Sequence, residues 1–125
     1  MNEFVVAKKV KANELLIRAA DEIANRGVSR GSCRGPDGSV DAWGALCLAA
    51  GAKYENLDNH VDDAYDYVPH GHIAALMSSY RLASAAVGHD IAEWSDTATK
   101  EQVAWLFQRL AHQVEAVFIP LDEPA

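Results

Sequence analysis

Hydrophobic residues recur every three or four positions along the C-terminal part of the chain, which is the spacing of one face of an α-helix. This stripe consists of Val103, Leu106, Phe107, Leu110, Val114, Val117 and Phe118. Thr99 and Gln102 stand at the spacing of a capping box, in which each side chain bonds the backbone amide of the other residue. Pro120 follows the last apolar residues and cannot continue a helix. The pattern therefore predicts a helix that begins at Lys100 and ends before Pro120.

A second amphipathic stretch predicts a helix from Glu14 to Arg26. Its inward stripe consists of Leu16, Ala19, Ala20 and Ile23. Asn13 is a good N-cap, because its short side chain can accept a hydrogen bond from the first turn. Gly27 stands where a left-handed C-terminal cap is expected, because glycine reaches positive φ without a Cβ clash. Both ends of this helix are thus marked in the sequence.

Two more helices are predicted in the middle of the chain. Asp41 is the expected cap of a short helix from Ala42 to Ala50, in which Gly44 lets another backbone approach closely. A further stripe runs from beyond Pro69 to Gly88. It consists of Ile73, Leu76, Met77, Tyr80, Ala83 and Val87.

The stretch between Val28 and Val40 differs in composition, since it is rich in Ser, Arg and Gly. Pro36-Asp37-Gly38 is typical of a tight turn, so we expect a β-hairpin here. The predicted fold is therefore mainly α, with about four helices packed as one small domain and a minor β-hairpin near residues 28–40. This single helical domain spans 1–125, with flexible ends at 1–12 and 121–125.

Composition agrees with one ordinary domain, because half of the 125 residues are hydrophobic and a chain of this length can bury a real core. Cys33 and Cys47 have neither a redox nor a zinc spacing and are expected to be reduced and structural. The longest apolar run is far shorter than the ~20 residues that span a bilayer. The N-terminus lacks the order of charges of a secretory signal. We therefore expect a cytoplasmic protein without membrane contact.

The formal net charge of −7 opposes direct binding to a nucleic-acid backbone. Arg26, Arg30 and Arg34 could form a small basic patch, although a solvated face is the simpler interpretation. The same negative charge is compatible with another hypothesis, in which the protein mimics nucleic acid and occupies a basic groove on another protein.

Chemistry-bearing motifs are few. The pair His89-Asp90 could, with His60, form the site of a metal-dependent hydrolase, but Asp90 and Glu93 also have the spacing of a helix cap. Gly-rich phosphate loops, nucleophile elbows and His-Glu-x-x-His motifs do not occur in the sequence. We accordingly predict no catalytic residue, no metal ligand and no cofactor. The three tryptophans, Trp43, Trp94 and Trp105, are all expected to pack against the core.

An acidic, tyrosine-rich stretch between Ala52 and Pro69 shows no helical period. Aromatic anchors among charged groups are typical of protein interfaces. The predicted contacts with an unidentified protein partner are Tyr54, Tyr65, Tyr67, Asp62 and Asp66. This pattern indicates a non-enzymatic accessory protein of unknown biochemical role that acts by protein–protein binding.

The chain also resembles a family of short, uncharacterised bacterial and phage proteins. The resemblance is carried by the Leu15-Leu16 and Ala19-Ala20 pairs and by Gly27, Gly38, Gly44, Trp94 and Asp96. Members often carry cysteine where this chain has Asp41, and Trp-Asn-Asp where it has Trp94-Ser95-Asp96. The resemblance implies a bacterial or phage origin and a helical fold, and it implies no activity.

Overall fold

The computed structural model describes residues 11–57 and 68–122, with side chains described up to Gln113. Over these residues the chain forms five α-helices and one short 3-10 helix. The helices are α2 (Ala12–Arg26), α3 (Ala42–Ala49), α5 (His70–Val87), α6 (Ile91–Ser95) and α7 (Lys100–Asp122), and the 3-10 helix is η1 (Tyr54–Asn56). The mainly α prediction is confirmed, and α6 is an additional helix that is too short to show a period.

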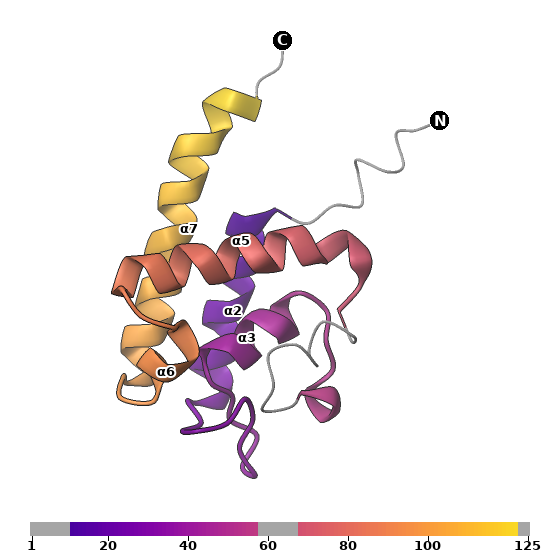
Figure 1. The fold of residues 1–125 in the computed structure, drawn as a ribbon, viewed down its shortest axis with the longest axis vertical. Helices are drawn as coiled ribbons and strands as arrows, with labels where there is room; N and C mark the ends of the chain where they lie inside the picture. The colour runs from indigo at the N-terminus through magenta and orange to yellow at the C-terminus, as the bar shows by residue number, and fades with distance from the viewer. Residues whose placement is uncertain (1–10, 58–67, 123–125) are drawn as a thin grey trace.

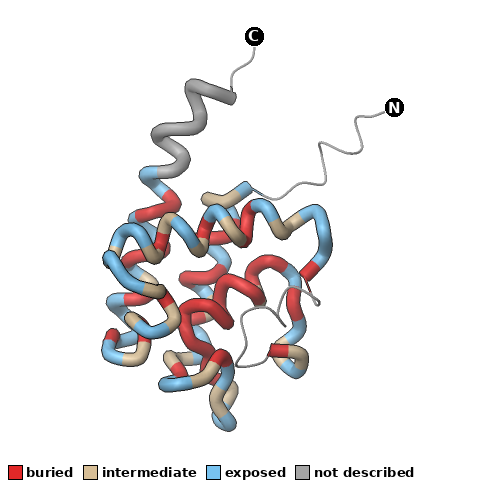
Figure 2. The backbone as a smooth tube through the Cα atoms, in the orientation of Figure 1, coloured by how far each residue is buried: buried red, intermediate tan, exposed pale blue. Residues whose placement is uncertain are grey.

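The helices pack around α2, which contacts α7, α3 and α5. Figure 1 shows α2 and α7 running antiparallel, with α5 crossing them and α6 at one end of the bundle. Nearly all of α3 is buried (Figure 2). The largest fully buried side chains are Trp43, Phe107, Leu15, Leu16, Ile23, Leu46, Leu76 and Ile91. None of the described helices is both long and apolar enough to cross a membrane.

The predicted start of α7 is confirmed. Gln102 donates its backbone amide to Thr99 Oγ1 at 3.1 Å, and Thr99 donates its own to Gln102 Oε1 at 2.9 Å. The predicted stripe is buried over its described part, Val103, Leu106, Phe107 and Leu110, whereas its last three members lie beyond the described side chains. The predicted end before Pro120 is wrong, because α7 continues to Asp122. Proline has no backbone N–H, so it removes one hydrogen bond of the helix. Because α7 ends two residues after Pro120, this loss affects only its last turn.

The predicted cap of α2 is also wrong. The helix begins at Ala12, so Lys11 is the N-cap and Asn13 lies inside the first turn. The Lys11 amide donates to Glu14 Oε1 at 3.3 Å, which gives the first turn an acceptor without Asn13. At the other end Gly27 terminates α2 with a positive φ of +86°, as predicted, but its ψ of 170° differs from the left-handed cap that was expected.

The remaining helix ends follow the sequence closely. Asp41 caps α3 by accepting from the Gly44 amide at 2.7 Å, and α3 ends at Ala49, one residue before the predicted end. Gly88 terminates α5 in the left-handed conformation.

The predicted β-hairpin is wrong. In the described part of the chain, Val40 makes only isolated bridges, to Val28 and to Arg34, and no strand forms. Val40 bonds backward to the segment 27–29, while the next residue, Asp41, bonds to the Cys33 carbonyl. Because the two sets of bonds lead to different segments, no ladder of paired residues develops. The turn at Pro36-Asp37 does form, closed by a 3.3 Å bond from the Gly38 amide to the Gly35 carbonyl.

Candidate protein-binding groove

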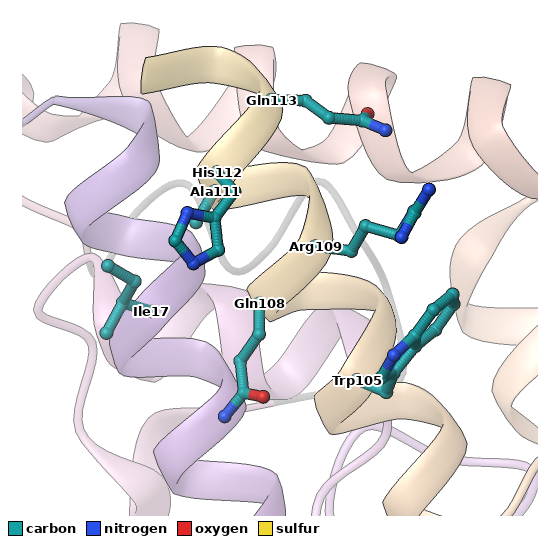
Figure 3. Close-up of a pocket in the computed structure, with 7 residues that line it drawn as sticks. All are labelled: Ile17, Trp105, Gln108, Arg109, Ala111, His112 and Gln113. Atoms are coloured by element: carbon teal, nitrogen blue, oxygen red, sulfur yellow. The ribbon is translucent and has the colours of Figure 1, made fainter. Parts of the chain in front are cut away.

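An open groove of about 620 Å³ lies along the outer face of α7 beside α2. We name it the α2–α7 groove. Its lining residues are Ile17 from α2 and Trp105, Gln108, Arg109, Ala111, His112 and Gln113 from α7 (Figure 3). Figure 3 shows His112 pointing toward Ile17, whereas Arg109 and Trp105 lie on the other flank of α7.

Exposed hydrophobic surface distinguishes this groove. Trp105 is 58% exposed and Ile17 is 48% exposed, and they are the exposed large hydrophobic residues among the described side chains. The expectation that Trp105 packs against the core is therefore wrong. Trp105 precedes the buried Phe107 by two positions, which is about 200° around a helix, so one helix cannot bury both rings against the same neighbour. For the other tryptophans the expectation is confirmed, because Trp43 is fully buried and Trp94 packs partly against the core.

The groove is basic, although the chain as a whole is acidic. The guanidinium of Arg109 lies 5.3 Å from the centre of the Trp105 ring, which is a cation–π distance. Arg109 is the charged residue among the seven that line the groove, and none of the seven carries a carboxylate. The groove therefore offers apolar surface beside a guanidinium group that attracts negative charge.

Five of the residues on which the resemblance was based lie elsewhere, around the loop 27–41 and the helices that it meets: Gly27, Gly38, Gly44, Trp94 and Asp96. We call this region the loop–α6 junction. Arg30 donates to the carbonyls of Ser95 and Ala98, each at 2.7 Å. The Gly31 amide donates to Asp96 Oδ1 at 2.8 Å. These bonds connect the loop to the end of α6.

The start of α3 is fixed in the same junction. The Ala42 amide donates to Ser95 Oγ at 3.2 Å. A Cβ atom placed on Gly44 would lie 2.4 Å from the Cys33 carbonyl oxygen, so the predicted close backbone approach is confirmed. Gly38 has φ +90°, and its carbonyl accepts from Arg26 at 3.3 Å. Gly38, Gly44 and Asp96 thus lie at contacts of this loop, and they do not line the groove.

Asp41 is a carboxyl group inside this junction, with only 4% of its surface exposed. Burial raises the pKa of Asp41 from 3.8 to about 7, the hydrogen bond from Gly44 opposes this shift, and the negative charges of Asp96 and Asp90 add to it. Burial also raises the pKa of the Cys47 thiol. We expect titration of Asp41 to act on stability, because the group serves as a helix cap inside the fold.

Of the predicted protein contacts, the structure describes Tyr54. This ring is partly buried between two guanidinium groups, with Arg26 at 4.9 Å and Arg34 at 5.7 Å from its centre. Its hydroxyl donates to the Gly35 carbonyl, so Tyr54 braces the loop against η1. A smaller hollow of about 380 Å³ lies beside it. Tyr65, Tyr67, Asp62 and Asp66 lie outside the described residues and stay predictions.

The His89-Asp90 pair acts as a helix start. Asp90 Oδ1 accepts from the Ala92 and Glu93 amides at 2.9 and 3.3 Å, and Oδ2 accepts from the Tyr80 hydroxyl. His89 forms an exposed 3.0 Å pair with Glu93. The capping interpretation is confirmed. His60 lies outside the described residues, and within them no three metal-ligating side chains form a group that could hold an ion.

Fold and groove together define a small α-helical domain with an open, partly apolar groove on its surface. Residues 7–113 match the model of a family of unknown function (DUF6197), and the chain belongs to that family. The matched region contains both the groove and the junction. No curated protein and no solved structure matches the chain.

Proposed function

We propose that this protein is a small cytoplasmic accessory protein of bacterial or phage origin, without enzymatic activity, that acts by binding another polypeptide in the α2–α7 groove. The observation that carries the proposal is the exposure of Trp105 beside Arg109, in a groove that the exposed Ile17 also lines. Tryptophan and arginine are the residues that most often dominate the binding energy of protein interfaces.

The energetic reason is the cost of leaving an indole in water. Covering the exposed part of Trp105 would contribute about 2–3 kcal/mol. The cation–π contact with Arg109 would become stronger once water is excluded from it. A partner with apolar anchors and carboxylates would satisfy both features of the groove.

Neither alternative from the sequence is adopted. A hydrolase would need Asp90 as a metal ligand, whereas both of its oxygens already accept hydrogen bonds. A mimic of nucleic acid would present carboxylates at its contact surface, and the groove lining contains none.

Site-specific photo-crosslinking in the native host tests the proposal. A photoreactive amino acid at Gln108, inside the groove, should yield a covalent adduct with a polypeptide. The same group at Ser78, an exposed position on α5, should not. Adding Trp105→Ala should abolish the adduct at position 108. If position 108 forms no polypeptide adduct, or if Trp105→Ala leaves the adduct unchanged, the groove is not the binding site.

A further inference from the structure

Both walls of the α2–α7 groove are α-helices. Ile17 belongs to α2, and the other lining residues belong to α7. The backbone N–H and C=O groups inside an α-helix are already bonded within the helix, so the groove walls offer no backbone partners to a bound chain. An extended segment would therefore leave its own backbone groups unpaired wherever the contact excludes water. A helical segment pairs these groups internally, so the groove suits a bound helix.

The apolar residues of the groove set the pattern that such a helix needs. Figure 3 shows Ile17 and Trp105 on opposite flanks of α7, so an occupant that covers both lies across α7. The lining stretch of α7 runs from Trp105 to Gln113, which is about 12 Å, and a bound helix of about three turns covers this distance. Apolar side chains at positions i, i+3 or i+4, and i+7 of the bound helix form one face that can reach both exposed residues.

Arg109 determines the charge that the bound helix should carry. Its side chain is exposed, and its guanidinium lies 5.3 Å from the centre of the Trp105 ring. Among the described residues it forms no ion pair with a carboxylate. The net charge of −7 is spread over the whole chain, and charges more than ~8 Å apart are largely screened at physiological ionic strength. The groove therefore favours a carboxylate on the occupant, within reach of Arg109.

A second copy of this chain does not match these requirements over its described residues. The large hydrophobic residues exposed there are Ile17 and Trp105 themselves, so another copy has no further apolar helix face to offer. A contact between two grooves across a two-fold axis would repeat the same surface on both sides. It would bring two Arg109 guanidinium groups into one interface, whose lining residues supply no carboxylate. The occupant that fits the groove is therefore a different polypeptide.

We propose that the polypeptide bound in the α2–α7 groove is an amphipathic α-helix of another protein, with an apolar face over Trp105 and Ile17 and an Asp or Glu beside Arg109. The inference rests on the proposed function, because it describes the partner of the same groove. It adds the conformation, the apolar spacing and the charge of the segment that binds.

Selection from a phage-displayed library of random peptides tests the proposal without knowledge of the natural partner. Peptides of about 16 residues are long enough for a helix of three turns. Those that bind the unchanged protein should share the apolar spacing i, i+3 or i+4, and i+7, with an acidic residue at a fixed offset. Trp105→Ala should weaken their binding by at least about thirtyfold, while circular dichroism should show that the variant is folded. Ser78→Ala, at an exposed position on α5, should bind the same peptides as the unchanged protein.

Two changes in the peptide that binds best separate conformation from charge. A central proline outside the apolar face should abolish binding, because it breaks the helix. Replacing the acidic residue by its amide should lower the affinity for the unchanged protein about fivefold, and it should have no effect on binding to Arg109→Gln. Arg81→Gln removes the same charge at an exposed position on α5 and should behave like the unchanged protein. Isothermal titration calorimetry measures these affinities.

The outcomes separate this inference from the proposed function. Peptides that need Trp105, have the apolar spacing and use their acidic residue through Arg109 support the bound helix. Peptides that bind without Trp105, tolerate the proline or prefer Lys or Arg overturn it, and so does a library that yields no Trp105-dependent peptide. If position 108 still captures a polypeptide in the photo-crosslinking experiment, the proposed function stands and only the bound helix is wrong. A captured second copy of this chain has the same meaning. If position 108 captures nothing, both are wrong.

Discussion

The loop–α6 junction and the α2–α7 groove differ in what they leave exposed. In the junction, Ser95 and Asp96 accept hydrogen bonds from the backbone amides of Ala42 and Gly31, the first bond buried and the second exposed, so the polar groups are paired. In the groove, Trp105 and Ile17 remain about half exposed. A buried polar group without a partner destabilises the fold, whereas single exposed apolar side chains are tolerated on a protein surface. The polar residues of the junction therefore maintain the fold, and the groove is lined by other residues.

Truncation of two aromatic residues on α7 should show this difference most strongly. Phe107→Ala, at a fully buried position, should lower the free energy of unfolding by about 4 kcal/mol, because it leaves a cavity in the core. Trp105→Ala should change the free energy of unfolding of the monomer by less than about 1 kcal/mol. Urea denaturation at low protein concentration measures both. Equal losses would mean that Trp105 belongs to the core after all.

The raised pKa of Asp41 predicts that the stability of the protein depends on pH. Its pKa is about 7 in the fold, against an ordinary 3.8, so the folded state holds a proton that the unfolded state releases. The free energy of unfolding should therefore fall as the pH rises from about 4 to about 7, by on the order of 4 kcal/mol from this group.

The variant Asp41→Asn isolates this contribution. Its amide oxygen can still accept from the Gly44 amide, but it carries no charge. The stability of the variant relative to the unchanged protein should increase with pH across the same window, as measured by urea denaturation at several pH values. A constant difference from pH 4 to pH 8 would show that Asp41 titrates normally.

Two glycine substitutions should change the free energy of unfolding in opposite directions. Gly44→Ala brings a Cβ atom within 2.4 Å of the Cys33 carbonyl oxygen and should lower the free energy of unfolding by about 2–3 kcal/mol. Gly71→Ala lies in α5 with no atom within 4 Å of the new Cβ and should raise it by up to about 1 kcal/mol, from helix propensity alone. Thermal unfolding of both variants measures these changes in stability. A stabilised Gly44→Ala would mean that the loop and α3 do not approach so closely.

The sequence predicts local features of this fold better than its tertiary features. The capping residues Thr99 and Asp41 act on amides within their own first turns, so their spacing in the sequence is sufficient. The predicted hairpin failed because Val40 pairs with two separate segments, and a turn motif carries no information on distant pairing. The groove was missed for the same reason. Trp105 lies off the apolar stripe of α7, and this was the available signal that its ring faces outward.

Substitution of Asp96 should have the smallest effect on the free energy of unfolding, and it tests individual contacts of the junction. Asp96→Ala removes the acceptor of the Gly31 amide and should lower the free energy of unfolding by about 1 kcal/mol, whereas Glu93→Ala on the same helix should change it by less than about 0.5 kcal/mol. Asp96→Asn separates the two roles of this side chain, because it keeps an acceptor for Gly31 and loses the charge that helps to raise the pKa of Asp41. We expect Asp96→Asn to retain most of the stability and to move the Asp41 transition to lower pH. If its transition coincides with that of the unchanged protein, Asp96 and Asp41 do not interact, and burial with the charge of Asp90 accounts for the raised pKa of Asp41.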